Sequence, residues 1–269
     1  RNFNNIFFDQ KIELLKKIDF FQKNEEWYKK EGHPHTLGLA LYGPPGTGKT
    51  SIIKCIANKL KRHLIVIPFN KIKTQSQFTK YYFEDRYNQN NPDKSIGFEE
   101  KIIVFDDIDC MSDLVIDRDK KKPQKEEDKD NTKIMMETIT TAVKSVKTSE
   151  DLISDICTKE DKITLSFILN IIDGIRETPG RILIVTSNFY DKIDAALKRP
   201  GRIDMEIEMK NASVKTICDM YKHYYNQEFP NRRRLKNGII APAKIVNTKL
   251  TSKNKEEFVE KICNLMKTS

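Results

Sequence analysis

The chain has 269 residues, of which 38% are hydrophobic and 32% charged, and 48 Lys and Arg residues against 39 Asp and Glu residues give a net charge of +9. This length suits one large domain with a small one, and the lack of any apolar run approaching ~20 residues excludes a membrane-spanning class for the sequence as given. Five scattered cysteines without a C-x-x-C pair favour a reducing intracellular compartment over a disulfide-rich secreted protein or a zinc site.

The first expected element is an entry segment at 1–36, in which apolar residues at helical spacing predict one helix over 9–30 with Asp9 as its N-cap. Five short apolar runs follow, most of them separated by helix-like stretches. Because these runs are continuous rather than alternating, they predict strands buried on both faces of a parallel sheet with right-handed crossovers. The predicted strands cover 37–42, 64–69, 102–105, 182–187 and 203–209.

The stretch LYGPPGTGKT at 41–50 contains the spacing G-x-x-x-x-G-K-T between a predicted strand and a predicted helix at 51–60. This is the context of a phosphate-binding loop. Its glycines let backbone N–H groups turn toward phosphate oxygens, and the helix N-terminus adds partial positive charge. We expect Lys49 to reach the β- and γ-phosphates and the Thr50 hydroxyl to bind magnesium. A plain Gly/Pro-rich turn does not explain Lys-Thr at this offset.

Two aspartates, Asp106 and Asp107, end the third apolar run. Ligands of an open α/β sheet bind at the carboxyl ends of its strands, so this pair is expected to face the phosphates. We predict that Asp106 holds magnesium through water and that Asp107 orients or deprotonates the attacking water. The alternative is a turn-capping pair, which the phosphate loop upstream disfavours.

Further polar residues follow the fourth run. Asn188 comes directly after it, where its amide could polarise the same water or contact the γ-phosphate, although an asparagine after a strand is commonly a turn residue. The stretch DKIDAALKRPGRID at 191–204 sets Arg199 and Arg202 around a Pro-Gly turn. Arginines that stabilise a transferring phosphoryl group are often supplied in trans, so we expect both to serve a neighbouring subunit's ATP.

The rest of the chain divides into an insertion and a lid. Residues 111–162, within a large domain at 37–210, are predicted to form a largely charged mobile insertion because their central part carries no apolar residue. After the fifth run the pattern becomes helical, with predicted helices at 213–225 and 254–267. We therefore expect a small helical lid domain at 211–269.

These motifs in this order resemble those of the AAA ATPases: GPPGTGKT, the acidic strand end, TSN, and A-L-x-R-P-G-R-x-D. The stretches EWYKKEGHPH, IIVFDDIDC, TLSFILNIIDGI and TSNFYDKIDAALKRPGRID are similar to one branch of that family. The branch contains the mitochondrial inner-membrane AAA chaperone that assembles the Rieske iron–sulfur protein into respiratory complex III, together with plant AAA-ATPase relatives. The resemblance covers nearly the whole chain.

The resemblance implies a three-layer AAA+ P-loop NTPase with a five-stranded parallel sheet and a helical lid. It also implies a homo-oligomeric ring, hexameric or heptameric, which hydrolyses ATP with Mg²⁺ at subunit interfaces and acts on a protein client. Asn188 becomes the first sensor, and Arg199 and Arg202 become arginine fingers. ATP binding falls to the loop residues Gly43, Pro44, Pro45, Gly46, Thr47, Gly48, Lys49, Thr50 and Ser51.

The chain departs from the family pattern in two places. The branch usually carries Glu-Asp and the wider family Asp-Glu, whereas this chain has Asp106-Asp107, which leaves the catalytic carboxylate about 1.5 Å shorter. We expect hydrolysis to be slower without being lost, because the carboxylate can act through water. Residues 69–85 also lack the short aromatic-Gly pore loop with which unfoldases grip an extended chain. We expect Tyr81, Tyr82 and Phe83 to lie in a helix core instead, in line with a folded or membrane-associated client.

Two other functions are compatible with the sequence. The charge of +9 suggests a DNA-acting loader ATPase, although the basic residues are scattered and give no strong nucleic-acid signal. The second alternative is a scaffold that senses ATP without turnover, although Asn188 and the two arginines suit catalysis better. The location is expected to be cytoplasmic, or the mitochondrial inner membrane if a membrane segment lies upstream of these residues.

Overall fold

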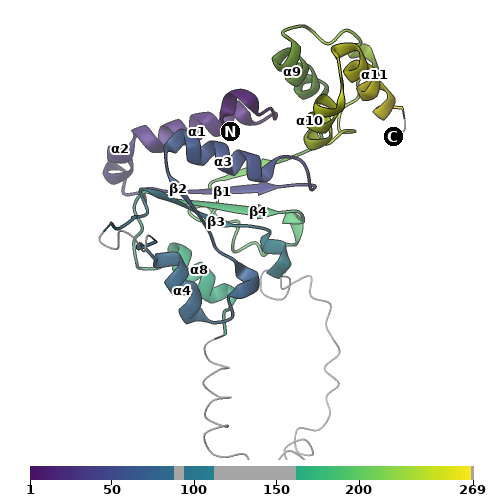
Figure 1. Cartoon of the computed structure of the whole chain (residues 1–269). Helices are drawn as coiled ribbons and strands as arrows, with labels where there is room; N and C mark the ends of the chain where they lie inside the picture. The colour runs from purple at the N-terminus through teal and green to yellow at the C-terminus, as the bar shows by residue number, and fades with distance from the viewer. Residues whose placement is uncertain (88–93, 112–161, 268–269) are drawn as a thin grey trace, which may run out of the picture.

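A five-stranded, all-parallel sheet with the strand order β2-β3-β4-β1-β5 forms the centre of the protein. The computed structural model describes residues 1–87, 94–111 and 162–267 (Figure 1). The predicted α/β fold with a five-stranded parallel sheet is confirmed. The strands are β1 (Thr36–Tyr42), β2 (His63–Val66), β3 (Lys101–Phe105), β4 (Arg181–Ser187) and β5 (Met205–Glu208).

Two predicted strands are longer than the observed ones. The second was expected at 64–69, but β2 ends at Val66, and Pro68 two residues later has no N–H for a ladder hydrogen bond. The fifth was expected at 203–209, but β5 pairs with β1 only from Met205. The element types are as predicted, and the boundaries shift by up to three residues.

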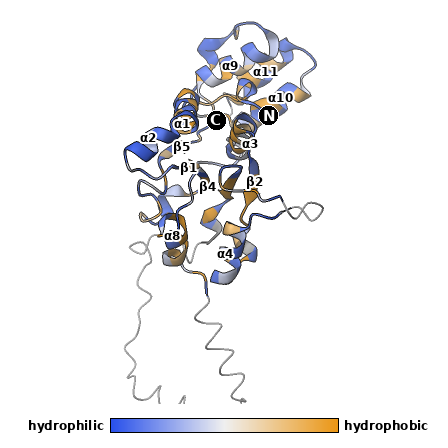
Figure 2. Cartoon of the chain, turned by 90° about the vertical axis from the view of Figure 1, so that its left-hand side faces the viewer, coloured by the Kyte–Doolittle hydropathy of each residue, from blue (hydrophilic) through white to orange (hydrophobic). Residues whose placement is uncertain are grey.

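Helices cover both faces of the sheet and make three layers (Figure 1). One face packs on α1 (Lys11–Lys23), α2 (Glu25–Lys30) and α3 (Lys49–Leu60), and the other on α4 (Gln75–Phe83) and α8 (Leu165–Asp173). Successive strand residues point to opposite faces, so Ile184 belongs to the first core and Val185 to the second. Figure 2 shows that α4 and α8 carry both hydrophobic and hydrophilic residues, as helices with one buried face do.

The entry segment is two helices rather than one. Helix α1 ends at Lys23 because the backbone of the next residue, Asn24, is not helical, and Asn24 Nδ2 donates to the Phe20 carbonyl oxygen 2.8 Å away. Asp9 was predicted as the N-cap, and this is wrong: Gln10 occupies that position without a side-chain cap. Asp9 instead accepts a 2.9 Å hydrogen bond from the hydroxyl of Ser213, far along the chain. A long-range contact has replaced the local cap.

The segment after β2 forms the helix α4, as predicted for Tyr81, Tyr82 and Phe83. Tyr82 is fully buried in the second core, and Phe83 packs against it half-buried. The prediction is wrong for Tyr81, which is 48% exposed because it lies on the outer side of the same helix. The predicted insertion at 111–162 lies, apart from its two end residues, outside the described residues.

Three helices with their own hydrophobic core follow β5. They are α9 (Val214–Tyr225), α10 (Pro242–Thr251) and α11 (Lys255–Leu265), of which α10 was not predicted. Ser213 and Asn254 cap α9 and α11 by accepting from the N–H groups of Thr216 and Glu257. Short 3₁₀ turns complete the described elements: Phe3–Asn5, Phe69–Lys71, Ile108–Met111, Tyr190–Lys192 and Arg232–Arg234. Among the described helices none is long and apolar enough to cross a bilayer.

Candidate functional site

The glycine-rich loop joins the end of β1 to the start of α3. The φ values of Gly43, Gly46 and Gly48 are 133°, 79° and 106°, and residues with a side chain rarely adopt such positive values. A Cβ at Gly43 would lie 2.1 Å from the carbonyl oxygen of Met209, so the loop also passes too close to the chain after β5 for a larger residue. The hydroxyl of the buried Thr47 donates to Pro44 O at 2.8 Å and closes the turn.

Lys49 links this loop to the fourth strand. Its Nζ donates to Asn188 Oδ1 at 2.7 Å, to Gly43 O at 2.7 Å and to Pro44 O at 3.2 Å. Burial lowers the pKa of Lys49, and the nearby carboxylates of Asp107, Asp109 and Asp106 act in the opposite direction. The ammonium group is therefore held at the mouth of the loop, where a phosphate oxygen can replace the loop carbonyls.

The carboxylates lie where β3 ends beside β4. Asp106 and Asp107 are both exposed, and Asp107 has a left-handed backbone with φ 46°. Asn188 Nδ2 lies 3.5 Å from Asp107 Oδ1, and Asn188 N donates to Asp109 Oδ1 at 3.1 Å. The structure thus brings Lys49, Asn188 and Asp107 into one chain of contacts, and sequence reasoning had missed Asp109.

The surroundings of Asp107 favour its protonated form more than water would. Although Asp107 is exposed, partial removal of water from its carboxylate by the surrounding atoms raises its pKa, the negative charges of Asp106 and Asp109 raise it further, and Lys49 lowers it. A carboxylate whose pKa is raised is a stronger base once it is ionised. This property suits a group that takes or orients a proton of water.

The two arginines differ sharply. Arg202 is held within its own chain: its Nε and Nη2 donate to the two Asp173 oxygens at 2.6 and 3.0 Å, and its Nη1 donates to Ala196 O at 2.5 Å. Arg199 is exposed, and the described residues give its guanidinium no ion pair or hydrogen bond. In the described structure neither side chain makes a hydrogen bond or ion pair with the glycine loop. The sequence analysis predicted the same role for both arginines and did not identify Asp173 as a partner of Arg202.

The remaining predicted binding residues lie at the start of α3. Thr50 is exposed, and the Ser51 hydroxyl accepts a hydrogen bond from Arg1. Thr50 and Asp106 offer the hydroxyl and carboxylate oxygens that Mg²⁺ prefers, while the glycine loop and the helix N-terminus offer N–H donors to phosphate. The residues present therefore fit a nucleotide with its magnesium ion.

A cavity of about 390 Å³ extends from the loop toward the C-terminal helices. It lies between Gly46–Gly48, Ile6 and Phe7 of the entry segment, and His223 of α9. The start of α10 closes it, with Ala243 N donating to Gly46 O at 3.1 Å. Its mixed apolar and polar lining suits a base and ribose. No local pattern in the sequence marks these residues, because the cavity forms only when three distant segments meet.

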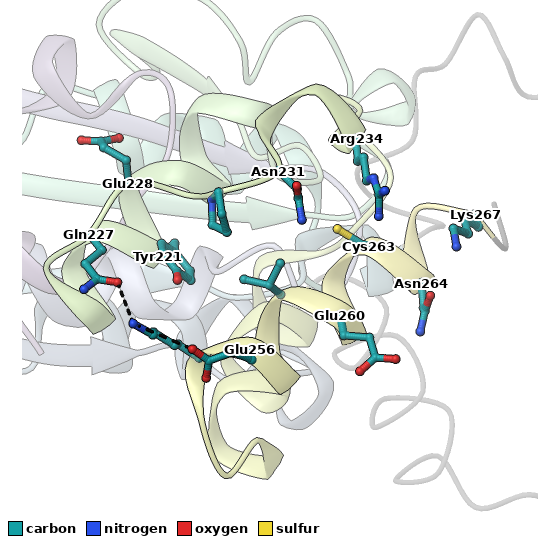
Figure 3. A pocket seen from close by; sticks show the side chains of 13 residues that line it. Tyr221, Gln227, Glu228, Asn231, Arg234, Glu256, Glu260, Cys263, Asn264 and Lys267 are labelled. Carbon is teal, nitrogen blue, oxygen red and sulfur yellow. Dashed lines mark hydrogen bonds and ion pairs between the residues drawn. The ribbon is translucent and has the colours of Figure 1, made fainter.

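A second hollow, of about 630 Å³, lies within the C-terminal helices (Figure 3). Glu256 and Glu260 share its lining with Arg234 and Lys267. It has no lining residue in common with the glycine loop, and its charges of both signs select no one ligand class. We assign it no role in the nucleotide site.

The chain was compared with known proteins. Residues 39–211 match the ATPase family associated with various cellular activities (AAA). AAA-ATPase At3g28510 of Arabidopsis thaliana is 32% identical over 97% of this chain and 46% of its own length, and AAA-ATPase At5g40000 is 29% identical over 96% and 49%. The probable mitochondrial chaperone BCS1-A of Dictyostelium discoideum is 28% identical over 83% and 43%.

The chain spans about half the length of the curated relatives it matches. These matches confirm the resemblance drawn from the motifs, including its mitochondrial-chaperone and plant branch. With the glycine loop, the parallel sheet and 173 matched residues, more than half of its length, the chain is a member of the AAA family of ATPases.

Proposed function

We propose that this protein is a magnesium-dependent ATPase that assembles into a homo-oligomeric ring and uses hydrolysis to move or remodel a protein. The observation that carries the proposal is the continuous contact from Lys49 through Asn188 to Asp107. It joins the phosphate-binding loop to the ends of two neighbouring strands. A loop that only held phosphate would not need this connection to a carboxylate.

Each side chain has a role in the proposed reaction. Lys49 exchanges its loop carbonyls for the β- and γ-phosphate oxygens, and the N–H groups of Gly43–Ser51 surround the phosphates. Asp107 orients the attacking water and accepts its proton, while the Asn188 amide fixes that water. Thr50 and Asp106 would hold the magnesium ion, which when bound neutralises charge on the phosphates.

In the described part of the chain neither arginine of the Pro-Gly turn makes a hydrogen bond or ion pair with the glycine loop, which supports a site shared between subunits. Arg202 is paired with Asp173, whereas Arg199 is exposed and has no ion pair or hydrogen bond from its side chain among the described residues. We propose that Arg199 completes the site of a neighbouring subunit. Arg202 would take part in trans only after it releases Asp173.

The client and the location are extended from the relatives. One match is named a probable mitochondrial chaperone and another, AAA-ATPase ASD of Arabidopsis thaliana, is named mitochondrial. We propose a folded or membrane-associated protein client and a mitochondrial association. Residues outside this chain would provide any membrane contact.

The test is the steady-state ATPase rate per chain as a function of protein concentration, with Lys49→Ala as the inactive control. A rate per chain that rises with concentration supports a site completed between subunits. A second arm mixes Arg199→Ala chains with Asp107→Asn chains, each inactive alone. Recovered activity supports the trans arginine, whereas none recovered although mixed assemblies form would refute it. ATP binding without turnover at any concentration would favour the sensing scaffold.

One observation keeps a DNA-acting ATPase as a second candidate. Residues 211–269 carry 12 Lys and Arg residues against 5 Asp and Glu residues, so the positive charge is less evenly spread than the whole sequence suggested. Arg232, Arg233 and Arg234 are all exposed there. Duplex DNA binding whose affinity falls steeply with salt would support this candidate, and its absence at low salt would remove it.

A further inference from the structure

Thr186 joins the two aspartates through one hydroxyl. It lies in β4, 1% exposed, and its Oγ1 donates to Asp106 Oδ1 at 2.7 Å. The same oxygen accepts from the backbone N–H of Asp107, also at 2.7 Å. A hydroxyl can donate once and accept twice, so one buried atom fixes the carboxylate of one residue and the backbone of the next.

The register of β3 and β4 explains why Thr186 is the residue that bonds both aspartates. Phe105 of β3 pairs with Val185 of β4, so the next step along both strands sets Asp106 beside Thr186. Their side chains point to the same face because side chains alternate along neighbouring parallel strands. Thr186, the next-to-last residue of β4, therefore bonds the acidic turn from within the sheet.

The hydrogen bond to Thr186 also bears on the backbone conformation of Asp107. Its φ of 46° is in the left-handed region, which residues other than glycine adopt only when surrounding contacts hold them there. The hydrogen bond from Asp107 N to Thr186 is a contact of that kind. The turn brings the short carboxylate within 3.5 Å of the Asn188 amide, although it lacks the extra carbon of a glutamate.

We propose that Thr186 is a positioning residue for hydrolysis: its hydroxyl holds Asp106 for the metal and fixes the turn that aims Asp107 at the attacking water. The proposal rests on the proposed ATPase function and deepens it. Thr186 is buried beneath the acidic turn, and its hydroxyl bonds only the two aspartates among the described residues. Its effect is transmitted wholly through the two aspartates.

The test compares Thr186→Val with Thr186→Ser. Valine keeps the shape and the strand preference but removes both hydrogen bonds, whereas serine keeps the hydroxyl. Thr248→Val is the matched control, because Thr248 is also buried and its hydroxyl donates only to Lys244 O in α10. Three properties are measured: kcat and KM, binding of a fluorescent ATP analogue across a Mg²⁺ titration, and the melting temperature.

We expect Thr186→Val to lower kcat about 10- to 100-fold, because a catalytic group displaced by about 1 Å can lose that much. Analogue binding without Mg²⁺ should stay unchanged, while the Mg²⁺ concentration for half-maximal enhancement rises severalfold. Thr186→Ser should restore kcat to within about threefold, and Thr248→Val should match the native chain.

Two results would overturn the proposal. One is a Thr186→Val chain with native kcat and native Mg²⁺ dependence. The other is an equal loss in the valine and serine variants together with a lower melting temperature, which would mean that Thr186 only packs. If the native chain itself has no turnover, the ATPase function fails, and the Mg²⁺ titration alone still decides whether Thr186 sets the position of Asp106.

Discussion

The contrast between the two arginines predicts opposite effects on stability and activity. Arg202→Ala removes two hydrogen bonds to Asp173 and one to Ala196 O, from a side chain that is 13% exposed. Hydrogen bonds to charged groups contribute about 1.5–3 kcal/mol each, but Asp173 is 40% exposed and water replaces part of the loss. We therefore expect a loss of about 2 kcal/mol in the free energy of unfolding.

Arg199→Ala should cost less than about 0.5 kcal/mol, since an exposed side chain without a partner loses little. Thermal unfolding separates the two, because about 2 kcal/mol lowers the melting temperature of a chain this long by about 4–8 °C. The ATPase assay should give the reverse order at equal folded concentration, with the larger loss in Arg199→Ala. Equal destabilisation by the two variants would refute the reasoning, and so would a stable Arg199→Ala chain with native activity.

Three further predictions follow from the site and its supports. Lys49→Ala should abolish nucleotide binding, measured by fluorescence titration, because it removes the ammonium group that reaches the phosphates; binding near the native affinity would contradict this. Asp107→Glu should raise kcat if the short carboxylate limits turnover, and a lower kcat would show that the left-handed turn is fitted to aspartate. Ser213→Ala should destabilise the chain by about 1 kcal/mol in urea unfolding, because it loses both the α9 cap and the bond to Asp9. Asp9→Ala loses the bonds from the Ser213 and Thr216 hydroxyls but keeps the cap, so it should cost less, and a cost equal to that of Ser213→Ala would contradict the assignment of the cap.

The sequence predicts well those features that depend on neighbouring residues. Apolar runs mark the buried strands because both faces of this sheet are covered. The loop at 41–50 is recognisable because its glycines, lysine and threonine have fixed offsets. Ser213 and Asn254 are recognisable as caps because an N-cap bonds an N–H group three residues away.

Features that join distant segments are not visible in the sequence. Asp9 looks like a helix cap, but its partner is 204 residues away and is known only when α9 packs against the entry segment. Thr186 is one threonine among many until the register of β3 and β4 sets it beside Asp106. Helix α10 was missed because its pattern is weak, with Val246 and Leu250 exposed on its surface.

The arginines show how geometry separates residues that a motif treats alike. Both flank the Pro-Gly turn, yet Arg202 turns back toward α8 and satisfies the charge of Asp173 at its C-terminal end. Arg199, three residues earlier, is exposed and has no such ion pair among the described residues. One chain therefore supplies a phosphate loop, a lysine, an asparagine and the carboxylates, and the arginine that we propose for a neighbouring site has no partner among the described residues. If hydrolysis needs that arginine, the fully competent unit is the contact between two chains, and dilution should abolish turnover before it abolishes nucleotide binding.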